Sequence, residues 1–430
     1  LHCIGATTLD EHRQYIENGA KIIRTNTYAC NTFTLNYEIE DVKESIKCAC
    51  KIAREAAKGH EDIFIAGDIG PITYNHNDMQ KQVSDEYVVI AKTMIESGVD
   101  AIVFETFPDM DDIKENYIYK LDNELLEMLL KDHSSKKNII WATENYAHKG
   151  FGYQFSDEIS IMSITGHNGG VIKPRIEKSK KEQAERIRNK AEVFTPSWIC
   201  NKQNNLIDNA WFGTDYVFNE EIDKTWIATT KPIVFPTETD KTWKDYINDV
   251  RLEITCGEAP YLVSRYDTVS GYQIELSQRI GLLDRKLRVV NENTQTENEW
   301  LKWAIKSFQN IYGYDWQGDN VLLARENLFF TFIEYYKAKF SKEPTIDILM
   351  KIAEILSWNI WQMDGLKFVI PKSCKEVEQG QLTLFDMNAE KQLCPGCAKN
   401  DPYAHTGVYC IIKDWKANKK VSFVSLLKKD

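Results

Sequence analysis

Short apolar runs alternate with longer amphipathic segments over residues 1–112. The pattern predicts strands at 20–27, 63–67 and 101–106 and helices at 42–58 and 86–97. Strands and helices that alternate in this way are typical of a parallel sheet or a (βα) barrel, where ligands meet the carboxyl ends of the strands. We therefore expect the polar residues at the carboxyl ends of these strands, such as Thr25 and Asp68, to lie near any ligand.

A second strand-and-helix pattern lies at 252–262 and 311–317. The first segment predicts a strand, a tight turn at Gly257 and a helix, and the second predicts a short strand that ends at Asp315. A glycine at such a turn lets the backbone approach a nucleotide, and a carboxylate at the tip of the next strand accepts hydrogen bonds from ribose hydroxyls. The pair favours a pocket for S-adenosylmethionine. The alternative is a turn without a ligand, with Cys256 as an inert buried thiol.

Four segments resemble, in the same order, motifs of the adenine-specific DNA methyltransferases of restriction-modification systems. They are AEVFTP at 191–196, LEITCGEAPYL at 252–262, YGYDWQGDNVLLARENL at 312–328 and NIWQMDGL at 359–366. The resemblance implies a Rossmann-like S-adenosylmethionine-dependent methyltransferase fold and DNA as the partner. It also implies these cofactor-binding residues: Phe194, Thr195, Pro196, Glu253, Cys256, Gly257, Asp315 and Asp364. Asp315 would bind the ribose and Asp364 the adenine ring, whereas Glu258 and Pro260 depart from the family's motif.

The same family holds its flipped adenine with an Asn/Asp-Pro-Pro-Tyr/Phe tetrad. The nearest string in this chain makes Asn400, Pro402 and Tyr403 the catalytic candidates. No apolar strand precedes them, so an exposed turn is the alternative. The chain would then be an M subunit that needs a restriction or specificity subunit, or a cofactor- or DNA-docking subunit without catalysis.

Residues 1–112 resemble the homocysteine S-methyltransferase domain of methionine synthases through AKIIRTNTY, IAGDIGP and GVDAIVFETF. The resemblance implies a homocysteine substrate, with Glu105 near its amino group. It also implies a zinc ion that keeps the substrate thiol deprotonated and that three later cysteines hold. Nothing after residue 112 continues this barrel, so we expect a partial, inactive (βα) barrel fragment. If this module is active, the chain is a homocysteine S-methyltransferase.

The length of 430 residues suggests two or three domains. We expect the barrel fragment at 1–112, a helical and basic region at 113–190, the cofactor-binding domain at 191–370 and a tail at 371–430. Near the first boundary, Asp122 is placed to cap an amphipathic helix at 121–130.

The net charge of −11 belongs mostly to residues 1–112, which hold 10 Lys and Arg against 20 Asp and Glu. The nearly neutral remainder contains a basic stretch at 173–190. A stretch of this kind favours contact with DNA phosphates, and a solvated helix face is the alternative. The candidates are Lys173, Arg175, Lys180 and Lys181.

The tail contains candidate zinc ligands in a CxxC pair and its neighbours, with His405 close by. The predicted set is Cys374, Cys394, Cys397 and Cys410. Gln381–Phe385 resembles the peptide that docks bacterial proteins on the sliding clamp, and an amphipathic turn is the alternative. The scattered cysteines, and the absence of a secretory signal or of an apolar run of ~18 residues, favour a reduced, cytoplasmic protein without a membrane partner.

Overall fold

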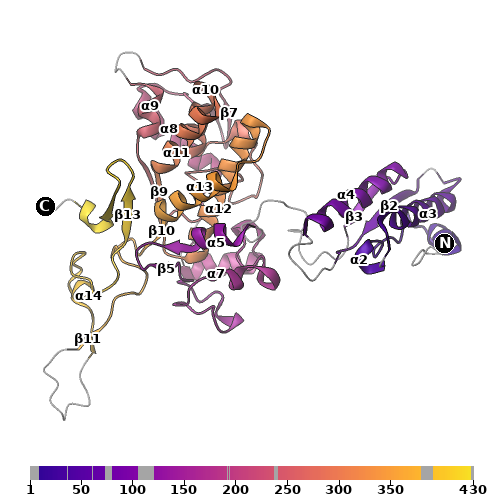
Figure 1. Cartoon of the computed structure of the whole chain (residues 1–430), viewed down its shortest axis with the longest axis horizontal. Helices are drawn as coiled ribbons and strands as arrows, with labels where there is room; N and C mark the ends of the chain where they lie inside the picture. The colour runs from indigo at the N-terminus through magenta and orange to yellow at the C-terminus, as the bar shows by residue number, and fades with distance from the viewer. Residues whose placement is uncertain are drawn as a thin grey trace, which may run out of the picture. The chain divides into compact units, whose positions relative to one another are not determined.

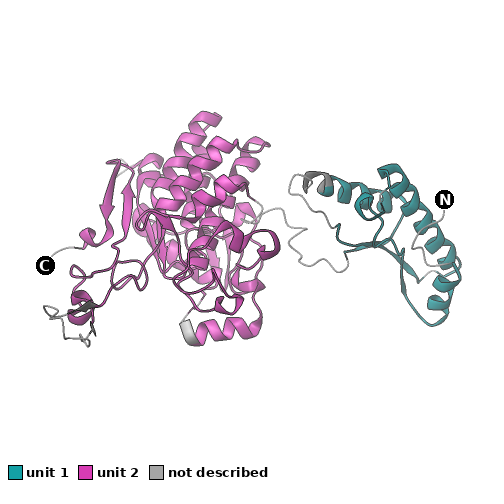
Figure 2. Ribbon diagram, turned by 60° about the horizontal axis from the view of Figure 1, so that its bottom comes forward, with its two compact units in different colours: residues 1–115 teal, residues 116–430 magenta. Residues whose placement is uncertain are grey.

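The computed structural model describes residues 9–35, 37–60, 62–72, 80–104, 121–190, 192, 194–236, 241–378 and 391–427. The chain divides into two compact units, residues 1–115 and residues 116–430 (Figure 2). This division lies close to residue 112, where the sequence predicts that the first module ends.

Unit 1 contains a three-stranded parallel sheet in the order β1-β2-β3, with helices between the strands (Figure 1). Its elements are α1 (Leu9–Glu17), β1 (Ile22–Arg24), α2 (Thr32–Leu35), α3 (Ile39–Ala57), β2 (Phe64–Ile69), α4 (Gln80–Glu96) and β3 (Ala101–Phe104). The predicted alternation of strands and helices is confirmed, because each predicted element overlaps an observed one.

Packing in unit 1 covers one face of this sheet. Ile23 and Ile65 pack with Ala53 of α3 in a buried cluster. Their chain neighbours Ile22 and Phe64 are 62% and 57% exposed. Because successive strand residues point to opposite faces, Ile22 and Phe64 lie on the second face, which is exposed where these two strands begin. The described part of unit 1 is an open sheet, whereas a closed (βα) barrel needs about eight strands.

Unit 2 is built around a parallel sheet in the order β10-β9-β8. Its strands are β8 (Arg251–Ile254), β9 (Ile311–Asp315) and β10 (Ile360–Gln362). The crossover helices are α10 (Leu282–Asn293), α11 (Glu297–Gln309), α12 (Gly318–Phe340) and α13 (Ile346–Asn359). This strand order is that of one half of a doubly wound sheet, and the described residues do not form the other half. The Rossmann-like methyltransferase fold therefore stays a prediction.

The other helices of unit 2 are α5 (Asn123–Leu130), α6 (Ile161–Ile164), α7 (Lys180–Lys190), α8 (Ser197–Phe212), α9 (Trp243–Asn248) and α14 (Pro395–Lys399). Four antiparallel strand pairs complete it: β4 (Lys131–Asp132) with β5 (Lys137–Asn138), β6 (Asn219–Ile222) with β7 (Thr225–Ala228), β11 (Val377–Glu378) with β12 (Lys391–Gln392), and β13 (Ile411–Asp414) with β14 (Lys419–Ser422).

The core of unit 2 surrounds α12, which is buried along most of its length. Its neighbours include α5, α10, α13 and β10. The predicted cap of α5 is confirmed, because the Asp122 carboxylate accepts a hydrogen bond from the Glu124 amide at 2.8 Å. No helix in the described ranges is long and apolar enough to cross a membrane.

Candidate functional site

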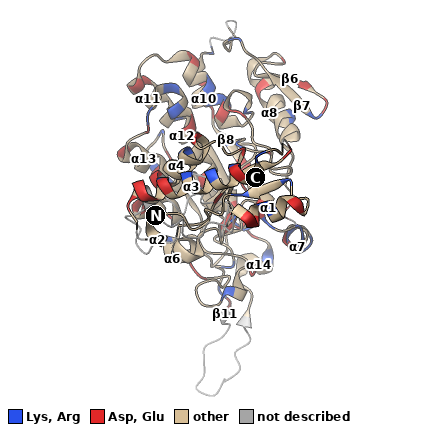
Figure 3. Cartoon of the chain, turned by 90° about the vertical axis from the view of Figure 1, so that its right-hand side faces the viewer, with Lys and Arg blue, Asp and Glu red and all other residues tan. Residues whose placement is uncertain are grey.

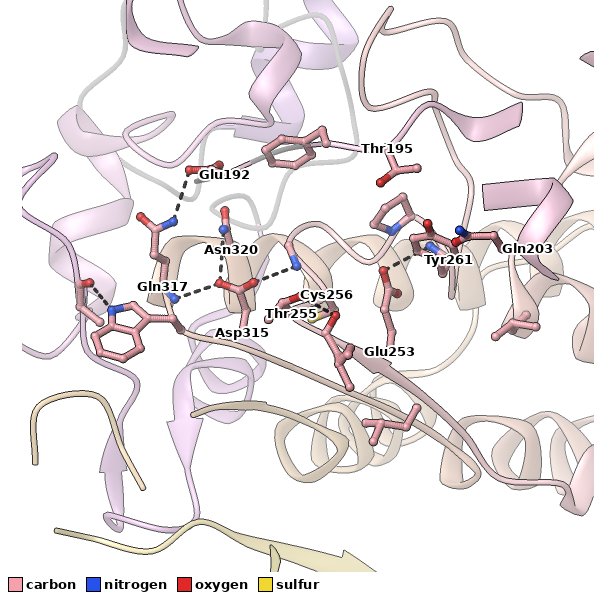
Figure 4. Close-up of a pocket in the computed structure, with 18 of the residues that line it drawn as sticks. Glu192, Thr195, Gln203, Glu253, Thr255, Cys256, Tyr261, Asp315, Gln317 and Asn320 are labelled. Atoms are coloured by element: carbon pink, nitrogen blue, oxygen red, sulfur yellow. Dashed lines mark hydrogen bonds between the residues drawn. The ribbon is translucent and has the colours of Figure 1, made fainter. Parts of the chain in front are cut away.

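A cavity of about 920 Å³ lies at the carboxyl ends of β8 and β9 (Figure 4). Its volume is in the range of small-molecule sites, and ligands of open α/β sheets bind at this end of the strands. Six of the eight residues predicted to bind the cofactor line it: Phe194, Thr195, Glu253, Cys256, Gly257 and Asp315. Residues from three separate segments of the sequence therefore meet at one cavity.

Asp315 ends β9 and is held by three donors. Its Oδ2 accepts a hydrogen bond from the Gly257 amide at 3.0 Å, and its Oδ1 accepts from the Gln317 amide at 2.9 Å and from Asn320 Nδ2 at 3.3 Å (Figure 4). Burial raises the pKa of Asp315 to about 6, although the hydrogen bonds from Gln317 and Gly257 lower it. Each carboxylate oxygen offers two acceptor positions, so Asp315 keeps acceptor capacity for a ligand.

The turn after β8 has unusual backbone geometry. Thr255, Gly257 and Ala259 all have positive φ, at 48°, 54° and 62°. Residues with side chains rarely adopt this region, so the turn is strained, and such strain is concentrated at binding sites. The Cys256 thiol is buried against Gly313 of β9. Burial raises the pKa of this thiol well above its ordinary value, which keeps it protonated and inert.

Two buried glutamates fix the loop that follows the turn. Glu253 accepts hydrogen bonds from the amides of Tyr261 and Leu262 at 3.4 and 3.2 Å. Burial raises the pKa of Glu253 well above its ordinary value. Glu258, which departs from the family motif, accepts from the Arg175 amide at 2.6 Å and from the Tyr266 hydroxyl at 2.7 Å. Glu258 does not line the cavity, so its carboxylate holds loops together and leaves the pocket open.

Several lining residues were missed by the sequence prediction. Gln317 and Asn320 lie in the methyltransferase-like segment 312–328 and hydrogen-bond Asp315. Their position just after the strand could have identified them as residues of the cavity. Glu192 lies in the methyltransferase-like segment 191–196 and accepts a hydrogen bond from Gln317 Nε2 at 3.3 Å. Gln203 and Lys372 come from distant segments and had no local signal.

Two predicted cofactor residues do not line the described cavity. Asp364 is buried, and its Oδ1 accepts from the amides of Leu366 and Lys367 at 3.0 and 3.2 Å. Its carboxylate therefore stabilises a turn after β10. Pro196 is the residue that precedes α8.

The catalytic candidates lie beside the CxxC segment. Asn400 ends α14 with a φ of 55°, and Tyr403 is 43% exposed. Neither these two residues nor Pro402 lines the described cavity. Their catalytic role stays a prediction.

The basic stretch is divided between the surface and the interior. Lys180 and Lys181 are exposed on α7, a helix that contains both basic and acidic residues (Figure 3). Lys173 and Arg175 are half-buried, and Arg175 lies over the Phe194 ring at 5.1 Å.

Arg186, from the same stretch, is buried and does not face solvent. It donates to Asp319 at 2.5 Å and to Glu192 at 3.0 Å, and Lys178 lies 3.9 Å from Asp319. Burial alone would raise the pKa of Asp319, but Arg186 and Lys178 hold it below its ordinary value. Arg186 and Lys178 thus neutralise a buried carboxylate and are not free for phosphates.

The predicted zinc set needs one correction. Cys374, Cys394 and Cys397 come together with His405, and all four ligand atoms lie within 4.8 Å of one another. Cys410 is not part of this group. It directly precedes β13 and is fully buried, and its thiol donates to the Gln362 carbonyl at 3.4 Å.

The carboxyl ends of the unit 1 strands carry a buried polar network. The hydroxyls of Thr25 and Thr27 lie 2.8 Å apart, and Thr27 donates to the Asp68 carbonyl at 2.7 Å. Thr25 also accepts from the Asp68 amide at 3.1 Å. The predicted position of these residues at the strand ends is confirmed, and their contact with a ligand stays a prediction. Glu105 and Gln381–Phe385 lie outside the described residues.

Residues 7–134 match the homocysteine S-methyltransferase family. The methionine synthases of Mycobacterium leprae and Mycobacterium tuberculosis are each 31% identical to the chain over 113 residues, which is 24% of this chain and 9% of each relative. The chain therefore spans less than a tenth of the length of these curated relatives.

These matches identify a homocysteine S-methyltransferase-type segment in the first part of the chain. The match passes residue 112 and ends at 134, beyond α5. The comparisons give no support to a restriction-modification M subunit, to DNA methylation or to S-adenosylmethionine binding, which stay predictions.

Proposed function

We propose that the chain is a methyltransferase whose unit 2 binds S-adenosylmethionine in the cavity at β8 and β9. The observation that carries this proposal is the hydrogen bond between Gly257 and Asp315 in the wall of that cavity. The glycine would let the ligand approach the backbone, and the carboxylate would accept from its ribose hydroxyls. Phe194 and Thr195 would cover the methionine end.

The cavity wall contains both acidic and basic side chains. Four carboxyl groups and one ammonium group line the described cavity: those of Glu144, Glu192, Glu253, Asp315 and Lys372. Arg186 pairs with Glu192 and burial raises the pKa of Glu253, so these two carboxyl groups add little to the attraction for a cation. S-adenosylmethionine carries a sulfonium, an ammonium and a carboxylate group. When bound, this cofactor supplies an electrophilic methyl group. The protein's part would be to position that group and to exclude water.

The acceptor of the methyl group has two candidates. Adenine in DNA rests on the resemblance of the motifs and their order alone. Homocysteine is the second candidate, and the comparisons favour it over DNA, because residues 7–134 match the homocysteine S-methyltransferase family. Against it, the described part of unit 1 has three strands, and no metal-ligand cluster lies among its described residues. Zinc-dependent thiol activation by this chain therefore remains a proposal.

Calorimetric titration of S-adenosylmethionine into the full chain tests the pocket. We expect micromolar binding by the wild type and loss of binding in Asp315→Ala. Asp347→Ala, an exposed carboxylate on α13, is the control and should bind like the wild type. Absence of binding to the folded wild type would overturn the proposal.

Transfer of a labelled methyl group from the cofactor then separates the two acceptors. Label in DNA supports the adenine candidate, and label in methionine made from homocysteine supports the second. Binding without transfer to either acceptor would overturn the enzymatic part of the proposal and favour a cofactor-binding subunit.

A further inference from the structure

The tail of unit 2 brings three thiols around one imidazole nitrogen. The Sγ atoms of Cys374, Cys394 and Cys397 lie 3.6, 3.6 and 3.7 Å from Nδ1 of His405. An imidazole nitrogen has either one hydrogen or one lone pair, so it cannot hydrogen-bond three sulfurs at once. Hydrogen bonding within the cluster therefore does not account for the arrangement.

The distances agree with a shared tetrahedral metal ion. With Zn–S bonds of about 2.3 Å and a Zn–N bond of about 2.0–2.1 Å, tetrahedral angles place each sulfur about 3.6 Å from the nitrogen. The observed separations of 3.6–3.7 Å match this value. All four donor atoms also lie within 4.8 Å of one another, which a single ion requires.

The backbone around the cluster is shaped to hold these ligands. Cys394 caps α14, and its Sγ accepts a hydrogen bond from the Cys397 amide at 3.4 Å. A Cβ on Gly396 would lie 2.6 Å from the backbone nitrogen and from Nδ1 of His405, so only glycine fits there. The His405 amide donates to the Tyr409 hydroxyl at 2.8 Å, and Tyr409 donates to the Pro402 carbonyl at 2.9 Å. Such outer contacts orient metal ligands.

We propose that Cys374, Cys394, Cys397 and His405 bind a structural zinc ion that joins the chain before β11 to the chain after β12. Thiolate and imidazole ligands in a tetrahedron select zinc. Four protein ligands leave no open position, so this site differs from a catalytic zinc that binds a substrate thiol.

The region around the cluster contains little regular structure that could stabilise it without a metal. β11 and β12 have two residues each and α14 has five, so regular structure contributes few hydrogen bonds. Small segments of this kind often depend on metal binding for their folding. The proposal is independent of the cofactor cavity, because none of the four ligands lines that cavity.

Metal analysis of the reduced full-length chain tests the site. We expect about one zinc ion per wild-type chain, and tetrahedral ligand-field bands with thiolate charge transfer after replacement by Co²⁺. Cys397→Ser and His405→Ala should lose the ion. Cys410→Ser is the matched control, since Cys410 lies in the same tail outside the cluster, and it should retain the ion.

A wild-type chain that binds no zinc after purification without chelators would overturn the proposal. So would octahedral Co²⁺ spectra of the wild type, or full zinc content in Cys397→Ser. The wild-type measurements remain decisive if a ligand variant fails to fold.

Discussion

The backbone amide of Gly257 donates a hydrogen bond of 3.0 Å to the Asp315 carboxylate, although 58 positions separate the two residues. The contact joins the turn after β8 to the tip of β9 at the wall of the cavity. One carboxylate therefore shapes the turn and also keeps acceptor capacity at the wall of the cavity. The same burial that positions Asp315 raises its pKa to about 6, which has consequences for binding and for stability.

Binding of S-adenosylmethionine should weaken as the pH falls below about 6, because protonated Asp315 loses acceptor capacity toward the ribose. Titration calorimetry between about pH 5 and pH 8 measures the dependence. In Asp315→Asn the affinity should be lower throughout and should not vary around pH 6. A wild-type affinity that is constant through this range would contradict the assignment of Asp315 to the ligand.

The stability of the ligand-free protein should depend on pH in the opposite direction to binding, and Asp315 should again be the cause. The folded-state pKa of Asp315 is raised from 3.8 to about 6, so folding binds a proton between these values and stability falls as the pH rises through them. Over this pH range the free energy of unfolding of the wild type should fall by about 3 kcal/mol relative to that of Asp315→Asn. Urea unfolding followed by tryptophan fluorescence reports on unit 2, which contains every tryptophan of the chain. An equal pH dependence in both proteins would disprove this account.

Removal of the buried cation at Arg186 should destabilise unit 2 by about 3–5 kcal/mol, because Asp319 would lose its closest counter-charge. We expect this loss in Arg186→Met, measured by the same unfolding assay. Lys181→Met removes an exposed charge from the same helix and should change stability by less than about 0.5 kcal/mol. Similar stability of the two variants would show that the Arg186–Asp319 contact is unimportant.

If α7 contacts DNA, replacement of its exposed lysines should change how the affinity for DNA depends on salt concentration. If Lys180 and Lys181 each neutralise a phosphate, their joint replacement by Ala should reduce the slope of log K against log salt by about 2. Fluorescence anisotropy with a duplex measures this slope. Lys416→Ala with Lys419→Ala removes two exposed charges elsewhere and should leave it unchanged. An unaltered slope in the α7 variant would identify the helix as a solvated face.

Local patterns in the sequence determined the features that depend on near neighbours. The cap at Asp122 and the turn at Gly257 were predictable because each is fixed by a few adjacent residues. The parallel strands of unit 1 followed from the periodicity of apolar positions. Asp315 was predictable as the end of β9 because it is an acidic residue that closes a short apolar segment.

Tertiary structure decided which of the candidate side chains share a site. His405 joins three cysteines that the sequence had grouped with Cys410, whereas Cys410 is buried in the core just before β13. Arg186 lies in a basic stretch of the sequence that suggests an exposed face, but its side chain is buried against Asp319. In both cases the outcome depends on the path of the chain between segments far apart in sequence. That path fixes the direction and the burial of each side chain. The spacing of residues along the sequence does not reveal the path.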